Sequence, residues 1–378
     1  MARPHTVPKV LHLHSTFAAG GKEIRAVGLM NAFGDALQHT IVSGQPDQLA
    51  ARELIADGVT AHFPSDFPSL TGWPTPGRLL AIARAMKPFD LILTYNWGAM
   101  DAVLAHTLFG SSLGLPALIH HEDGFNEDEA HGLKNSRNWM RWVALRNAHK
   151  LVVPSQVLER IACSTWKRPP EQVQRIPNGI DTEGFAQDAD PSTLPLAKGD
   201  GELWIGTLAG LRPVKQLPRL VAACARLSQH WHLVILGEGP ERGAIEAKAE
   251  ALGVESRVHL PGAIKDSAKV IGLFDIFALS SKSEQFPLSV VEAMAAGLPI
   301  AAPDIGDVKA MVSEANRPFI RPVGSPEILA ATLAEFASNP AMRSEIGAQN
   351  RGKARAQFDQ QTMIETYRAL YWGAMEGS

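Results

Sequence analysis

Cysteine is almost absent from this chain, and its two cysteines, Cys163 and Cys224, lie far apart. Their spacing matches no metal motif and gives no disulfide framework, which favours a reducing compartment. No apolar run approaches the roughly 18 residues that a membrane-spanning helix needs. The N-terminal segment also lacks an apolar core of signal-peptide length, so we expect a cytoplasmic protein.

A strong excess of either charge is also absent, because the 378 residues carry a formal net charge of −3. Binding to nucleic acid through its phosphates needs a basic surface, so we expect no nucleic-acid partner. The 45% hydrophobic and 20% charged content is typical of a globular chain. The length exceeds that of one ordinary core and predicts two domains.

Clusters of metal ligands are missing as well. No group of Asp, His or Cys has metal-ligand spacing, and no Asp-x-Asp pattern follows a predicted strand. We therefore expect no metal ion and no cofactor.

The chain does contain two series of short apolar strands, each strand followed by a longer amphipathic segment. This alternation predicts parallel sheets that bind ligands at the carboxyl ends of their strands. Two series predict two doubly wound α/β domains. The first series is expected at 9–14, 40–43, 90–94, 117–120 and 151–154. The second is expected at 203–207, 232–236, 258–260, 276–279 and 300–302.

The same pattern predicts where the domains end. We expect a first domain over residues 1–185 and a second over 186–356, with the polar segment 187–201 as the linker. Residues 357–378 contain a last helix, at about 360–372, which can cross back to the first domain.

The most informative segment runs from Ser283 to Pro299. Glu284 lies in a predicted loop with Pro287, and Glu292 lies about one turn into an Ala-rich helix. A helix N-terminus attracts an anion, and a nearby carboxylate can hold sugar hydroxyls. Together they favour a site for a nucleotide sugar. The alternative is a solvated loop glutamate and an unrelated glutamate on a helix face.

Other motifs accompany this segment in a fixed order. They are Gly20-Gly21-Lys22-Glu23, Pro177-Asn178-Gly179-Ile180-Asp181, Gly206-Thr207-Leu208 through Pro213-Val214-Lys215, Leu236-Gly237-Glu238-Gly239-Pro240 and Pro261-Gly262. The ordered set resembles the family-4 retaining glycosyltransferases of the GT-B fold, over nearly the whole chain. It is most similar to bacterial enzymes that build exopolysaccharide, lipopolysaccharide or glycolipid. The resemblance implies two Rossmann-like domains facing a cleft, with the donor bound mainly by the second.

The resemblance also implies the reaction. A sugar would pass from a nucleotide diphosphate sugar, UDP-linked by preference and GDP-linked as the alternative, to a glycan or lipid-linked acceptor, with retention of anomeric configuration. Two other functions stay open: a nucleotide-sugar epimerase of the same fold, and a non-catalytic protein that binds sugar nucleotides.

Several donor-side roles follow from the resemblance. Glu284 would meet the sugar hydroxyls and Glu292 the ribose. The ammonium of Lys215 would stabilise charge that grows on the leaving diphosphate, unless it is an ordinary surface lysine. Backbone N–H groups for sugar and phosphate are expected from the loop of Phe286, Pro287 and Leu288.

Two further donor-side assignments concern glycines and an arginine. The family's arginine falls on Gly210 here, and Arg212 can supply the guanidinium from a shifted loop. Gly20 and Gly21 follow the first strand, where glycines let the backbone approach a ligand, although many such pairs are simply turns.

The acceptor side is expected at the ends of first-domain strands. Asp123 occupies the position where relatives commonly carry a histidine, and can bind the acceptor hydroxyl or act as a base. His121 is the alternative catalytic residue, with His120 on the acceptor side. We expect one of these two histidines, but not both, to be a core residue. Asn96 and Trp97 follow another strand and can line the acceptor side, Trp97 being equally compatible with core packing.

Residues 134–150 predict a helix with several basic side chains and with Trp139 and Trp142. Basic residues with tryptophan suit an anionic membrane interface, which would place the enzyme peripherally at the inner face of the membrane. The alternative is an amphipathic helix that packs its tryptophans on the sheet and leaves its charges solvated.

Overall fold

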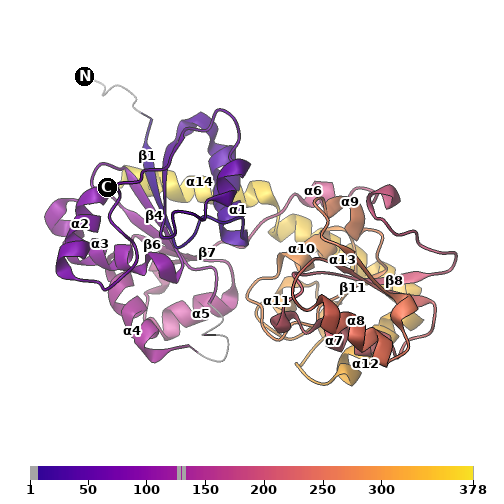
Figure 1. Ribbon diagram of the computed structural model, residues 1–378. Helices are drawn as coiled ribbons and strands as arrows, with labels where there is room; N and C mark the ends of the chain where they lie inside the picture. The colour runs from indigo at the N-terminus through magenta and orange to yellow at the C-terminus, as the bar shows by residue number, and fades with distance from the viewer. Residues whose placement is uncertain (1–6, 126–128, 130–132, 378) are drawn as a thin grey trace. The chain divides into compact units, whose positions relative to one another are not determined.

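The structure is a computed structural model that describes residues 7–125, 129 and 133–377 (Figure 1). The chain divides into two compact units. Unit 1 comprises Met1–Pro177 and Met363–Ser378, and unit 2 comprises Asn178–Thr362.

Unit 1 is built on a seven-stranded parallel sheet in the order β3-β2-β1-β4-β5-β6-β7. The strands are β1 (Lys9–His14), β2 (Gln38–Ser43), β3 (Ala61–His62), β4 (Leu91–Tyr95), β5 (Leu118–His121), β6 (Lys150–Val153) and β7 (Val173–Arg175). The helices are α1 (Gly21–Phe33), α2 (Pro76–Met86), α3 (Met100–Leu113), α4 (Asn135–Ala144), α5 (Gln156–Ser164) and α14 (Gln360–Glu376), of which the last begins in unit 2.

Alternation along the strands of unit 1 sends side chains to two separate cores. Val10 of β1 packs with α1 and α14, whereas its neighbour Leu11 packs with α2 and α3. Both faces of the sheet are therefore covered, which explains why its strands are continuous apolar runs. Figure 1 shows α14, in yellow, beside the sheet of unit 1.

Unit 2 is built on a six-stranded parallel sheet in the order β10-β9-β8-β11-β12-β13. The strands are β8 (Leu203–Leu208), β9 (Trp231–Leu236), β10 (Val258–Gly262), β11 (Ile276–Ala278), β12 (Ile300–Pro303) and β13 (Ile320–Arg321). The helices are α6 (Thr182–Phe185), α7 (Leu217–Cys224), α8 (Arg242–Ala251), α9 (Ala268–Ile271), α10 (Leu288–Ala295), α11 (Val308–Met311), α12 (Pro326–Ser338) and α13 (Pro340–Gln357).

Both sheets reverse their strand order beside their first strand. The reversal lies between β1 and β4 in unit 1, and between β8 and β11 in unit 2. In open parallel sheets a crevice forms outside the carboxyl ends of strands at such a switch point, and ligands bind there. The strand order therefore points to the loops after these four strands as the candidate ligand-binding loops.

All ten predicted strands are present, and the prediction of two doubly wound α/β domains is confirmed. The prediction that 151–154 closes the first sheet was wrong, because β7 adds one more parallel strand. The two-residue strands β3 and β13 were also missed.

The units divide at residues 177/178, whereas the sequence placed the boundary at 185/186. Residues 178–185 belong to unit 2 because Ile180 N donates to Phe358 O at 3.0 Å and Thr182 Oγ1 donates to Asp359 Oδ2 at 2.7 Å. Gly179 permits this pairing, since a Cβ there would stand 2.8 Å from Asp359 O. The expected linker 187–201 is also part of unit 2, where Leu194 is buried in the core.

Candidate functional site

The switch point of unit 2 brings Lys215 and Glu284 together. Lys215 ends the short 3-10 helix Pro213–Lys215 after β8, and Glu284 lies in the loop after β11. Lys215 Nζ lies 2.5 Å from Glu284 Oε1, and Ser281 Oγ donates to the same oxygen at 2.6 Å. Their side chains are 16% and 14% exposed, so the pair is partly open to a ligand.

Helix α10 begins immediately after this loop. Pro287 is its N-cap and Leu288 its first residue, and no side chain caps its first N–H groups. The N-terminus of α10 is therefore available to accept an anion. Phe286 packs edge-on against Phe358, with ring centroids 5.6 Å apart, and anchors the loop to the core.

Glu292 lies about one turn into α10, as predicted. Burial raises the pKa of its carboxyl to about 7. Its carboxylate has no hydrogen-bond or ion-pair partner among the residues that the structure describes. A carboxyl group in this state is poised to accept hydrogen bonds from a polar ligand.

Arg212 lies close to the position that the family's arginine would occupy. The Arg212 Nε atom is 3.5 Å from the place where a Cβ of residue 210 would stand. Its side chain is exposed and has no ion pair within the described part of the chain. The Arg212 side chain thus lies in van der Waals contact with position 210.

Two glycines keep the loops after β8 and β9 in backbone contact. Gly237 and Gly239 have φ values of 148° and 153°, which favour glycine. Added Cβ atoms would stand 1.9 Å from Ala209 O and 2.6 Å from Leu211 O. Leu211 N also donates to Glu238 O at 2.9 Å. The Leu236–Pro240 motif therefore shapes the loop that carries Lys215.

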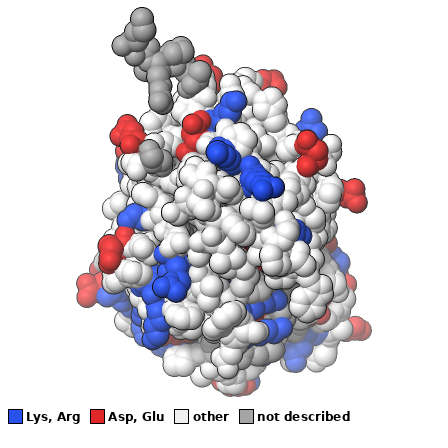
Figure 2. Space-filling model, turned by 90° about the vertical axis from the view of Figure 1, so that its left-hand side faces the viewer, with Lys and Arg blue, Asp and Glu red and all other residues white. Residues whose placement is uncertain are grey.

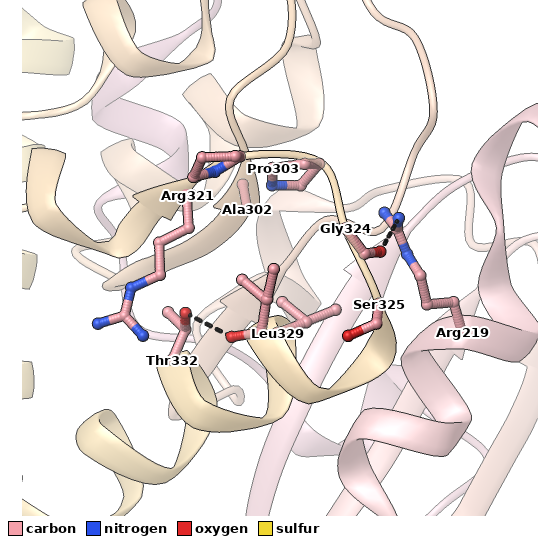
Figure 3. A pocket seen from close by; sticks show the side chains of 10 residues that line it. Arg219, Ala302, Pro303, Arg321, Gly324, Ser325, Leu329 and Thr332 are labelled. Atoms are coloured by element: carbon pink, nitrogen blue, oxygen red, sulfur yellow. Dashed lines mark hydrogen bonds between the residues drawn. The ribbon is translucent and has the colours of Figure 1, made fainter.

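A small pocket of unit 2 lies behind this site, between α7, α12 and the end of β12 (Figure 3). Its Arg219 donates to Gly324 O at 3.1 Å and also to Ser280 O. Ser280 Oγ in turn donates to Lys215 O at 2.8 Å. Since Arg219 is already engaged with backbone carbonyls, its guanidinium supports the donor-side loops rather than presenting a charge to the pocket.

Gly20 and Gly21 lie at the start of α1 with exposed backbone. A Cβ at residue 20 would stand 2.9 Å from Glu23 Oε2, so the glycine is needed for the buried Glu23 side chain to fold back over the helix start. Glu23 is itself bound by Thr16 Oγ1 at 3.2 Å and by Lys22.

Asp123 follows β5 and forms a bidentate ion pair with Arg25 of α1. Arg25 Nη2 donates to Asp123 Oδ2 at 2.9 Å. The backbone N–H of Asp123 donates to Asn96 Oδ1 at 2.7 Å, and Asn96 N donates to His121 O at 2.8 Å. Asn96 holds this position with a φ of 54°, an unusual conformation for any residue other than glycine.

His120 and His121 are both core residues, so the prediction that just one would be was wrong. His120 Nδ1 lies 2.8 Å from Thr94 Oγ1, and His121 Nε2 lies 3.2 Å from the Tyr371 hydroxyl of α14. Burial holds the pKa of His121 well below its usual value. Adjacent strand residues point to opposite faces, and both faces are covered at β5.

The predicted helix at 134–150 is shorter, since α4 ends at Ala144. Its burial pattern contradicts the alternative in which the tryptophans pack on the sheet and the charges are solvated. Arg141 is buried, 3.1 Å from Glu122 Oε2, and lies with Arg137 over the Trp97 ring. Trp139 and Trp142 are instead 63% and 39% exposed. Trp97 is half-buried against the core.

No group of three or more His, Cys, Asp or Glu side chains within residues 7–125, 129 and 133–377 could hold a metal ion. None of the described helices is long and apolar enough to cross a membrane. On the face shown in Figure 2, Lys and Arg side chains lie in small separate groups among uncharged and acidic residues.

Each of the two units matches a known protein family. The family described as Glycosyltransferase Family 4 matches residues 19–184, and the family described as Glycosyl transferases group 1 matches residues 195–353. The chain belongs to the family-4 glycosyltransferases. The predicted family and enzyme class are thereby confirmed.

Relatives of this glycosyltransferase are bacterial. A GDP-mannose-dependent alpha-mannosyltransferase of Mycobacterium tuberculosis is 28% identical over 72% of this chain and 71% of its own. The putative glycosyltransferase EpsF of Bacillus subtilis is 29% identical over 55% of this chain and 58% of its own. A crystal structure of Anabaena HepE in complex with UDP has a TM-score of 0.80 at 20% identity, covering 96% of this chain and 99% of the other. Its similarity confirms the GT-B fold.

One residue at a predicted site of this glycosyltransferase was not identified from the sequence. Arg25 belongs to none of the motifs singled out in the sequence, but its side chain reaches Asp123, which lies 98 positions further along the chain. The only local signal was the presence of an arginine just after the Gly20-Gly21 turn, and that signal does not name a partner.

Proposed function

We propose that this glycosyltransferase moves a sugar from a nucleotide diphosphate sugar to a glycan or lipid-linked acceptor, with retention of anomeric configuration. The observation that carries the proposal is the Lys215–Glu284 pair, which lies at the switch point of unit 2 beside the uncapped N-terminus of α10. This arrangement offers a cation, a carboxylate and backbone N–H groups within one short stretch of surface. A sugar diphosphate needs the same three kinds of group.

The donor replaces an internal ion pair. In the protein without ligand, Lys215 and Glu284 neutralise each other across 2.5 Å. The diphosphate takes Lys215 as its partner, and the sugar hydroxyls donate to Glu284. Each charge keeps a partner throughout, so neither is left desolvated and unpaired when the donor enters. Glu292 accepts hydrogen bonds from the ribose, which provides the partner that its buried carboxyl lacks.

Positively charged groups of the protein beside the leaving diphosphate accelerate the transfer. The bond between the anomeric carbon and the diphosphate oxygen breaks, and a bond forms from that carbon to the acceptor oxygen. The acceptor proton passes to a phosphate oxygen of the departing diphosphate. Lys215, Arg212 and the N-terminus of α10 stabilise the negative charge that grows there. These groups supply the role that a metal ion would otherwise have.

The relatives guide the choice of nucleotide. HepE of Anabaena, which has a similar fold, is described in complexes with UDP and with UDP-glucose. The relative of Mycobacterium tuberculosis is GDP-mannose-dependent. We therefore place UDP-sugars first and GDP-sugars second.

Unit 1 contributes the acceptor-side residues. Asp123 and Asn96 lie at the carboxyl ends of β5 and β4 and are joined by a 2.7 Å hydrogen bond. Asp123 is more accessible than His121, since its side chain is 14% exposed whereas His121 is 1% exposed. We assign the acceptor hydroxyl to Asp123. His120 and His121 are buried in the strand that leads to Asp123, and Trp97 packs against Arg137 and Arg141 of α4.

The exposed tryptophans of α4 provide a contact for anionic lipid. Trp139 and Trp142 lie one turn apart, and the exposed Arg146 follows them. Aromatic side chains of this kind insert at the headgroup level, and each nearby basic residue adds roughly 1 kcal/mol.

Replacement of both tryptophans by alanine should abolish co-sedimentation with vesicles of phosphatidylglycerol. Trp73→Ala is the control, because Trp73 is 87% exposed but lies outside α4. Unchanged binding of the double variant would exclude this contact.

A thermal-shift panel of UDP, GDP, UDP-glucose and GDP-mannose tests the donor class, because a ligand of the native state raises the melting temperature by mass action. Product analysis then separates the three candidate functions. A transferase forms a glycoside only with acceptor, an epimerase changes the donor sugar without acceptor, and a binding protein does neither. Absence of any shift with all four nucleotides would refute the proposed donor site.

A further inference from the structure

The Arg25–Asp123 pair joins α1 to the loop after β5 and is largely buried. The Arg25 and Asp123 side chains are 8% and 14% exposed, and both carboxylate oxygens of Asp123 accept from the guanidinium. A fork-to-fork contact of this kind fixes the orientation of the carboxylate as well as its charge.

The surroundings of the pair are neutral. Burial raises the pKa of Tyr95 and of Tyr371 above the usual value and raises that of Tyr367 to about 12. Burial lowers the pKa of His14 and of His121 well below the usual value. Around neutral pH none of these five groups is charged. Lys22 of α1 also acts on His14 in this cluster, and it is paired with Glu23.

The pair also helps to fix the backbone of the loop after β5, on the acceptor side. Asp123 is held through its side chain by Arg25 and through its N–H by Asn96, whose own φ of 54° is maintained by the hydrogen bond to His121 O. Release of Arg25 would free one of two anchors of the loop. A displacement of about 1 Å at a reacting group can lower a rate by about a hundredfold.

We propose that Arg25 is a positioning residue for transfer: it holds Asp123 as an oriented hydrogen-bond acceptor for the acceptor hydroxyl. In the proposed transfer the acceptor proton passes to the departing diphosphate, so Asp123 orients the hydroxyl without taking its proton. This inference rests on the proposed function, in which Asp123 meets the acceptor.

The variants Arg25→Met, Arg25→Lys, Asp123→Asn and the double variant Arg25→Met/Asp123→Asn test this role. The assay is release of UDP from UDP-glucose, with water as the acceptor, measured over about pH 6 to pH 9. The control is Arg168→Met, because Arg168 is buried in unit 1 but donates to the backbone oxygens of Trp142 and Trp166. Melting temperatures of all variants report on folding.

Arg25→Met and Asp123→Asn should each lower kcat by about tenfold or more. The double variant should be no slower than Asp123→Asn, since the two residues act as one unit. Arg25→Lys should recover part of the rate. Arg25→Met should lower kcat at every pH measured with little change in the KM for UDP-glucose, because the donor is bound by unit 2. Arg168→Met should lower stability but keep the kcat and KM of the wild type.

If Arg25→Met unfolds, the double variant, which leaves no unpaired charge, still tests the coupling of the two residues. Additive losses in kcat, or a wild-type kcat in Arg25→Met beside an inactive Asp123→Asn, would show that Arg25 merely stabilises unit 1. That result would overturn this inference and leave the proposed function intact. If the wild type neither releases a nucleotide from UDP-glucose or GDP-mannose nor is stabilised by any of the four nucleotides, the proposed function fails and this inference fails with it.

Discussion

Glu292 should make the native state less stable as the pH rises. Burial raises the pKa of its carboxyl from an unfolded value of 4.5 to about 7. Between these values the native state binds the proton more tightly than the unfolded state does, so the free energy of unfolding falls with pH. Each pKa unit corresponds to about 1.4 kcal/mol, which gives a cost of about 3 kcal/mol above pH 7 and none below about pH 4.5.

Glu292→Gln removes this titration and keeps the shape of the side chain. The variant should match the wild type near pH 4.5 and exceed it by about 3 kcal/mol at pH 8.5. For a unit of this size that is a difference in melting temperature of about 6 to 12 °C. The exposed Glu250→Gln on α8 is the control, because it makes the same chemical change on the surface, where a substitution alters stability little.

Calorimetry of the three proteins from about pH 4.5 to pH 8.5 measures this difference. The reasoning would be refuted if the difference in stability between Glu292→Gln and wild type stayed constant with pH, or if it grew toward low pH. Affinity for UDP adds a second readout. If the ribose donates to the carboxylate, wild-type affinity should fall as the pH drops through about 7, and the variant should lose that dependence.

The donor side gives three more expectations. Lys215→Ala should lower kcat/KM for UDP-glucose, through a loss of about 2–4 kcal/mol of transition-state stabilisation. Arg212→Ala should lower it less, because Arg212 is more exposed. Equal losses in the two variants would contradict this order. Glu284→Gln should nearly abolish transfer but bind free UDP up to about tenfold more tightly, since Lys215 loses its competing partner; titration calorimetry with weaker UDP binding would exclude the proposed exchange of partners. Transfer should persist in excess EDTA, and its loss on chelation with recovery on adding magnesium would show that Lys215 and α10 do not suffice.

The strands and the donor-side residues could be predicted because their signals are local. Apolar runs bounded by glycine, proline or polar residues marked every strand of four or more residues. Strands such as β3 and β13, of two residues each, carry no periodic pattern and were not predictable. Lys215 and Glu284 were both identified from their motifs, but their contact, across 69 positions, required the topology of the sheet.

The acceptor side was harder to predict because burial there depends on neighbours from other parts of the chain. His120 and His121 occupy a central strand, and the helix that covers His121 comes from the far end of the sequence. Arg141 reads as a surface charge on an amphipathic helix. Its burial became evident only with Glu122 and Glu129, which lie 19 and 12 positions away.

The return of α14 to unit 1 has a consequence for the order of synthesis. Tyr367 and Tyr371 cover the face of the sheet that carries Val10, Leu93 and Ile119, yet they are synthesised after the whole of unit 2. Unit 2, which is continuous from Asn178 to Thr362, is complete before them. Unit 1 can therefore close its core only after unit 2 has been made. Until then α1 covers that apolar sheet face only in part, and a nascent chain in this state is a natural substrate for chaperones.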